Sequence, residues 1–269
     1  MGEPTKPRNL SEQAYDRIRR DIILGERLPG EKLLIEAMSE RYEIGMVPIR
    51  EALNRLSAEG LVLRESNRGF SVSLLSLNDL EELVSTRIQL ETLALRTSIQ
   101  RGDEAWEERL VLSYHRLART HRLLPPEAGR ERVSEEWEPR HRDFHLALLD
   151  ACGSRWLLGF CSTMIDHAVR YRNVSMNAQA SQLRRAGATG EHEALLHAAL
   201  ERDADLACML LEQHYRITLD GVRQVTSMAR PTDRSPLAAG EMPLPAVAGA
   251  PPQQTRGRRP RIRRAGGEL

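Results

Sequence analysis

One stretch decides how the first quarter of this chain folds: Gly45-Met46-Val47-Pro48-Ile49-Arg50-Glu51-Ala52-Leu53-Asn54-Arg55-Leu56-Ser57-Ala58-Glu59-Gly60. Its apolar side chains recur at intervals of three and four residues, at Ile49, Ala52, Leu53 and Leu56, which places them on one face of a helix. Pro48 is tolerated in a first turn, where backbone N–H groups have no partner within the helix. The stretch therefore predicts a short amphipathic helix that ends at Gly60.

The segments on either side of this helix complete a recognisable unit. Upstream, Leu33, Leu34, Ala37 and Met38 predict a second amphipathic helix, and the connection over residues 42–45 has the length of a helix-turn-helix. A further helix opens at Ser11, and residues 61–64 and 70–73 predict two strands joined by a hairpin over 65–69. This order predicts a winged helix-turn-helix, in which the helix after Gly45 reads DNA.

Four motifs in this region resemble the GntR type of bacterial transcription regulator. They are Leu28-Pro29-Gly30-Glu31-Lys32-Leu33, Pro48-Ile49-Arg50-Glu51-Ala52-Leu53, Glu59-Gly60-Leu61-Val62 and Asn67-Arg68-Gly69. The chain departs from the family just before Pro48, where Gly45-Met46-Val47 replaces the usual Ser-Arg-Thr. The resemblance implies a DNA-binding head with the candidate contact residues Lys32, Met46, Val47, Arg50, Arg55, Arg68 and Gly69.

These candidates have different expected partners. Arg50 is expected to contact a base edge or a phosphate, Arg55 and Lys32 phosphates, and Arg68-Gly69 the groove beside the wing. A salt bridge to Glu51 or Glu59, both four residues away, is the alternative for Arg55. The first 75 residues carry twelve basic and twelve acidic side chains, so local placement of the cations must provide the affinity for phosphate.

At 269 residues the chain is long enough for two domains. Residues 10–75 form the predicted winged helix-turn-helix, and residues 76–227 read as an all-helical bundle of about six helices, with segments at 78–100, 103–124, 131–151, 154–176, 181–200 and 203–227. Residues 1–9 and the Pro/Ala/Arg-rich tail 228–269 are expected to be disordered. The fold class is therefore mainly α.

The helical part resembles the ligand-sensing FCD domain, in the six-helix subgroup named for the vanillate regulator. The residues that carry this resemblance include Arg87-Ile88-Gln89-Leu90-Glu91, Phe144-His145, Glu191-His192 and His214. Members of that family commonly bind a divalent metal through three histidines and an Asp or Asn. The resemblance implies a site at His145, His192 and His214, with His141 in the fourth position.

The chemistry of these side chains limits the metal. His141 and His145 are four residues apart, so they share one helix face, and neutral imidazoles favour transition metals such as zinc or nickel over magnesium. Arg87 matches a family arginine that faces the ligand cavity, where it could hold an effector carboxylate; the alternative is a pair with Glu91. Arg170 and Arg172 are further effector candidates, and two arginines would favour a dicarboxylate.

These observations predict a homodimeric regulator that is not an enzyme. We expect a repressor that a small carboxylate metabolite, bound at the metal site, releases from a pseudo-palindromic double-stranded operator. The alternatives are a metal-dependent enzyme and an architectural DNA-binding dimer without a ligand response. No apolar run is long enough to span a membrane, and three unpaired cysteines suit a reducing cytoplasm.

Overall fold

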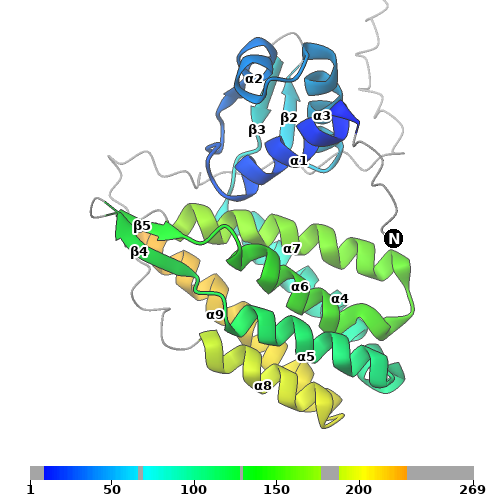
Figure 1. The fold of residues 1–269 in the computed structure, drawn as a ribbon. Coiled ribbons are helices and arrows are strands. Elements are labelled where there is room, and N and C mark those ends of the chain that lie inside the picture. The colour runs from blue at the N-terminus through cyan, green and yellow to red at the C-terminus, as the bar shows by residue number, and fades with distance from the viewer. Residues whose placement is uncertain (1–8, 66–68, 128–129, 177–187, 229–269) are drawn as a thin grey trace, which may run out of the picture.

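The computed structural model describes residues 9–65, 69–127, 130–176 and 188–228. Within these residues a small winged helix-turn-helix precedes a larger bundle of helices (Figure 1). The two terminal segments predicted to be disordered lie outside the described residues, apart from Asn9 and Met228, and so does the DNA-contact candidate Arg68.

The first unit has three helices and three strands: α1 (Leu10–Ile23), β1 (Lys32–Leu33), α2 (Ile35–Tyr42), α3 (Met46–Ala58), β2 (Val62–Glu65) and β3 (Gly69–Val72). The strands form an antiparallel sheet in the order β1-β3-β2. Ile49, Ala52, Leu53 and Leu56 are fully buried in its core, as the helical periodicity predicted. The apolar face of α3 therefore points inward, and its opposite face is exposed.

The segment before α2 differs from the prediction. Lys32 and Leu33 lie in β1, paired with Ser71 and Phe70 of β3, and not at the start of a helix. Leu34 and Ala37 are exposed, so the buried face of α2 consists of Met38 and Tyr42. Pairing with β3 satisfies the backbone of residues 32 and 33, and α2 consequently begins at Ile35.

The second unit contains six α-helices within the described residues: α4 (Leu77–Arg101), α5 (Glu104–Ala118), α6 (Trp137–Leu149), α7 (Arg155–Met176), α8 (Ala188–Leu200) and α9 (Ala204–Met228). A short 3-10 turn, η1 (Asp150–Cys152), follows α6. Ser76 and Asp103 cap α4 and α5, because their side chains accept hydrogen bonds from the backbone N–H groups of Asp79 and Trp106. The helix α4 packs against α6, α7 and α9, and three cysteines lie buried and unbridged.

A β-hairpin interrupts the helices where the sequence analysis expected none. The strands β4 (Leu123–Glu127) and β5 (Arg130–Val133) pair antiparallel, with Leu123 opposite Val133, and the hairpin lies at one end of the bundle (Figure 1). β4 contains Pro125 and Pro126, which lack an N–H group and restrict the residue before them to extended backbone. The predicted helices 103–124 and 131–151 therefore shorten to α5 and α6.

The winged helix-turn-helix lies against α7 (Figure 1). Three side chains of α7 donate hydrogen bonds to backbone carbonyls of the winged helix-turn-helix: Asn173 Nδ2 to Ile23 O at 2.9 Å, Arg170 to Ser73 O at 2.8 Å, and His167 Nε2 to Glu59 O at 2.8 Å. Asp166 of α7 adds an ion pair with Arg19 of α1. One helix of the bundle thus holds the DNA-binding unit through both hydrogen bonds and charge.

Candidate metal centre and DNA-binding surface

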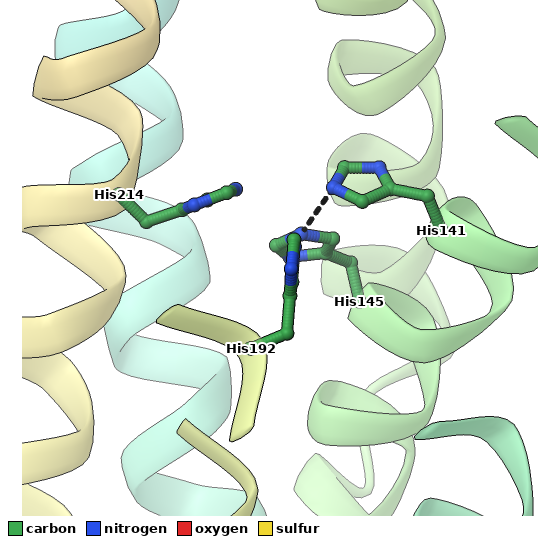
Figure 2. A group of neighbouring side chains, drawn as sticks. All are labelled: His141, His145, His192 and His214. Atoms are coloured by element: carbon green, nitrogen blue, oxygen red, sulfur yellow. Dashed lines mark hydrogen bonds between the residues drawn. The ribbon is translucent and has the colours of Figure 1, made fainter. Parts of the chain in front are cut away.

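Four histidines from three helices converge in the bundle. His141 and His145 project from α6, His192 from α8 and His214 from α9, and their rings point toward one another (Figure 2). All four are at most 6% exposed. The structure therefore brings together the complete set of residues that the sequence proposed as metal ligands.

The spacing of the ring nitrogens suits one metal ion. Nε2 of His141 and Nε2 of His145 are 3.2 Å apart, and one nitrogen from each of the four rings lies within 4.8 Å of the others. Two nitrogens bonded to one ion at about 2.1 Å are about 3.0–3.4 Å apart when adjacent and about 4.2 Å apart when opposite. If the two most distant nitrogens, up to 4.8 Å apart, bind on opposite sides of the ion, their separation must shrink to about 4.2 Å, a contraction of roughly half an ångström. The donor set and its dimensions fit a divalent transition metal.

Hydrogen bonds orient two of the rings with a lone pair toward the centre. Tyr215 donates its hydroxyl proton to Glu91, so its oxygen can accept from Nδ1–H of His145 at 3.3 Å. Nδ1–H of His214 donates to Glu191 at 2.7 Å. In both rings the proton sits on Nδ1, which leaves Nε2 deprotonated and available to a metal.

His141 is held differently. Its ring stacks on Trp137 with centroids 4.5 Å apart, and its Nδ1 lies 3.4 Å from a guanidinium nitrogen of Arg172. Arg172 is itself paired with the buried carboxylate of Glu138. Because an arginine can only donate, Nδ1 of His141 accepts and its Nε2–H donates to Nε2 of His145. To bind a metal through Nε2, His141 must therefore move this proton to Nδ1 and give up the contact with Arg172.

Burial favours the neutral form of three of the four imidazoles. Burial lowers the pKa values of His141 and His145 well below the usual range, and positive neighbours add to the effect: Arg172 for His141 and the other rings for both. Burial also lowers the pKa of His214, although the Glu191 carboxylate opposes that shift. A neutral ring is the protonation state that binds metal, so the site needs no proton release from an imidazolium at neutral pH.

A small cavity of about 20 Å³ adjoins His141 and His214 and is bordered by two of the three arginines proposed for effector binding, Arg87 and Arg172. Arg87 is paired with Glu91 at 2.7 Å, as its spacing on α4 suggested, and this carboxylate offsets burial and raises the pKa of Arg87. Arg170 does not border the cavity: it donates to Ser73 O at the junction between the two units. The geometry thus keeps Arg87 and Arg172 as effector candidates and gives Arg170 a different place.

The candidate DNA-binding surface is the exposed face of α3. A groove of about 490 Å³ between α3 and the wing is bordered by Arg50, Asn54, Arg64 and Gly69. Arg50 and Gly69 were candidates from the sequence, whereas Asn54 was not selected. Its position four residues after Arg50 on the polar face of α3 was the available signal, because i and i+4 lie side by side.

Of two other candidates, Arg55 contacts a side chain of the protein and Lys32 is exposed. The guanidinium of Arg55 lies 4.1 Å from the centre of the Tyr15 ring, and Tyr15 in turn donates to Glu59. Arg55 therefore faces α1, where a cation–π contact replaces the salt bridge considered from the sequence. Lys32 is exposed on β1, beside the wing strands.

A winged helix-turn-helix followed by a helical domain is the architecture of a class of bacterial transcription regulators. The model of the bacterial regulatory proteins of the gntR family matches residues 10–72, and the FCD domain model matches residues 82–217. The chain belongs to the GntR family and carries an FCD domain.

Relatives over most of the chain are transcription regulators and not enzymes. The chain is 40% identical over 221 residues to the "Uncharacterized HTH-type transcriptional regulator BphR" of Paraburkholderia xenovorans, covering 81% of this chain and 86% of the relative. It is 32% identical over 213 residues to the "HTH-type transcriptional repressor GlaR" of Escherichia coli, covering 78% and 94%. The metal-dependent enzyme considered from the sequence is thereby set aside.

Solved structures share the fold. "E. coli McbR/YncC" superimposes with a TM-score of 0.67 at 19% identity, over 81% of this chain and 99% of the other. A GntR regulator from Rhodococcus sp. RHA1 gives 0.61 at 20% identity, over 82% and 99%. Among the described residues of this chain, none of the helices is both long and apolar enough to cross a bilayer.

Proposed function

We propose that the protein is a DNA-binding repressor whose affinity for its operator is set by a divalent transition metal, zinc or nickel, and by a small carboxylate or dicarboxylate bound beside it. In this proposal it acts as a homodimer on a pseudo-palindromic operator. One observation carries the proposal: four buried imidazoles converge in a helical domain that is packed directly against the winged helix-turn-helix.

His141, His145, His192 and His214 would hold the metal, and on a six-coordinate ion four protein nitrogens would leave two positions for a further ligand. When bound, the metal supplies Lewis acidity that attracts a carboxylate oxygen. Arg87 and Arg172 border the adjoining cavity and are placed to hold a second carboxylate oxygen. These residues therefore support an anionic effector.

The effector site is closed in this conformation. A cavity of about 20 Å³ holds roughly one water molecule, and both arginines are already paired, Arg87 with Glu91 and Arg172 with Glu138. An effector must therefore open the cavity and compete with at least one buried glutamate. That rearrangement is the step through which binding can change the protein's conformation.

Polar contacts connect α6, which carries two of the histidines, to the winged helix-turn-helix through α7. Arg142 follows His141 on α6 and donates to Asp166 of α7 at 2.8 Å, and Asp166 pairs with Arg19 of α1. An opening that moves α6 against α7 disturbs this contact between the two units. Effector binding then shifts operator affinity by as much as it prefers one domain arrangement over the other.

The test measures binding to a duplex from the region upstream of the chain's own gene, by fluorescence anisotropy. Metal-free, zinc-loaded and nickel-loaded protein are compared, each with and without a panel of small mono- and dicarboxylates. We expect metal-loaded protein to bind the duplex and one class of carboxylate to weaken binding at least five-fold, the lower end of typical allosteric couplings. Operator affinity that no carboxylate changes supports the architectural dimer.

The ligand assignment is tested by elemental analysis of purified variants. His145→Ala combined with His192→Ala should abolish bound metal. His197→Ala is the matched control, because His197 is exposed on the same helix as His192. A double variant that retains one metal per chain would place the site elsewhere.

A further inference from the structure

The first turn of α3 exposes two apolar side chains. Met46 is 53% and Val47 is 69% exposed, whereas Ile49 two residues later is fully buried. One strip along the exposed face of α3 contains Met46, Val47, Arg50 and Asn54. Arg50 is four residues after Met46 and three after Val47, and Asn54 is four residues after Arg50, so each is a neighbour of the next on the helix surface. The exposed strip is therefore apolar at the N-terminus of α3 and polar further along the helix.

The groove beside this strip is lined by two cations and one carboxylate. Arg50, Arg64 and Glu65 border it between α3 and the wing, and exposed Lys32 lies on the adjoining sheet. A duplex seated there has its phosphates near these cations and its base edges near the strip. The occupant argued for here is therefore double-stranded DNA, which rests on the proposed function.

The apolar side chains restrict which base they can read. A recognition helix directs its N-terminal residues toward base edges in the major groove. The major-groove edges of guanine, cytosine and adenine present only hydrogen-bonding groups, whereas thymine adds a 5-methyl group. Met46 and Val47 have no strong donor or acceptor, so they gain contact energy only from that methyl group.

We infer that Met46 and Val47 are specificity residues that read thymine methyl groups where the N-terminus of α3 enters the major groove. Gly45-Met46-Val47 at the start of α3 offers no polar side chain to a base edge, so readout by this turn is apolar. Asn54, two turns further along, carries the amide that pairs with N6 and N7 of adenine. Each operator half-site should therefore contain A·T pairs along this strip.

The test removes single methyl groups from DNA. A duplex that binds the full-length protein tightly is selected from a random library, and each thymine is then replaced in turn by deoxyuridine. At one or two thymines in each half-site, at symmetry-related positions, we expect the replacement to weaken binding about four-fold. This factor corresponds to the free energy of burying one methyl group.

The variants Met46→Ala and Val47→Ala assign the effect to these side chains. Each should bind the thymine duplex more weakly and lose its sensitivity to deoxyuridine at the corresponding position. Val111→Ala is the matched control, because Val111 is also exposed but lies on α5 of the helical domain. Circular dichroism of each variant tests whether alanine at these exposed positions leaves the fold intact.

The outcomes separate the inference from the function on which it rests. If the variants remain as sensitive to deoxyuridine as the wild type, or if no thymine is sensitive, the apolar readout is refuted while DNA binding stands. If the library yields no duplex that binds, the proposed function fails and the inference fails with it.

Discussion

Asp166→Asn removes a negative charge that contacts two arginines of different domains. Asp166 accepts from Arg142 of α6 at 2.8 Å and pairs with Arg19 of α1. Its side chain is 11% exposed and those of Arg19 and Arg142 are 25% and 31% exposed, so solvent screens this site less than an open surface. The variant leaves two cations facing a neutral amide.

The size of the loss follows from this intermediate burial. Exposed ion pairs contribute about 0–1 kcal/mol, and breaking a fully buried pair costs about 3–5 kcal/mol. The amide of asparagine retains one hydrogen bond, so we expect the free energy of unfolding to fall by about 1.5–3 kcal/mol. The proposed communication predicts a second effect, a smaller change in operator affinity when metal is added.

Urea unfolding followed by circular dichroism measures the first effect, and fluorescence anisotropy with the operator duplex measures the second. Asp150→Asn is the matched control, because Asp150 pairs with Arg109 in a contact whose side chains are 47% and 53% exposed. That variant should lose less than about 1 kcal/mol and keep its response to metal. Equal losses in the two variants would refute the argument from burial.

Three further predictions concern DNA, metal and pH. Arg50→Ala should weaken operator binding by about 1–3 kcal/mol with the fold unchanged, and unaltered anisotropy titrations would remove Arg50 from the reading surface. Tyr215→Phe takes away the acceptor for Nδ1–H of His145 and should lower metal affinity about ten-fold in chelator competition; an affinity equal to wild type would contradict that role. Burial, and after it Arg170, lower the pKa of His167, so the unfolded chain binds more protons once the pH falls below about 6.5, and the free energy of unfolding should decrease there. His167→Gln should reduce the slope of this decrease in urea titrations of metal-free protein between pH 5 and 7, where His141, His145 and His214 contribute with the same sign. A slope equal to that of the wild type would argue against the assignment.

Several features were accessible from sequence because they follow from local periodicity. The buried face of α3 and the shared face of His141 and His145 both result from the helical repeat of 3.6 residues. The pair between Arg87 and Glu91 follows from the same repeat. The convergence of α6, α8 and α9 on one site came from family resemblance, because spacing within one helix cannot place another helix.

Other features depend on contacts between distant residues. β1 forms because Lys32 and Leu33 find β3 nearly forty residues later, and no local pattern marks that pairing. Arg55 turns to Tyr15 of α1, and Arg170 turns to Ser73 across the domain junction. The hairpin β4–β5 did have a local signal, the Pro125-Pro126 pair, which is incompatible with the interior of a helix.

The imidazole of His141 affects the net charge of the site, because a neutral ring stands where a carboxylate would add a negative charge. In the buried charge balance around the four rings, Arg87 cancels Glu91 and Arg172 cancels Glu138, so Glu191 is the carboxylate left to offset a dication. A ligand set with a carboxylate in the place of His141 would supply one more negative charge from the protein. With imidazole there, a centre that held a dication would carry a surplus positive charge in a medium of low dielectric, and a singly charged anion from solution would offset it.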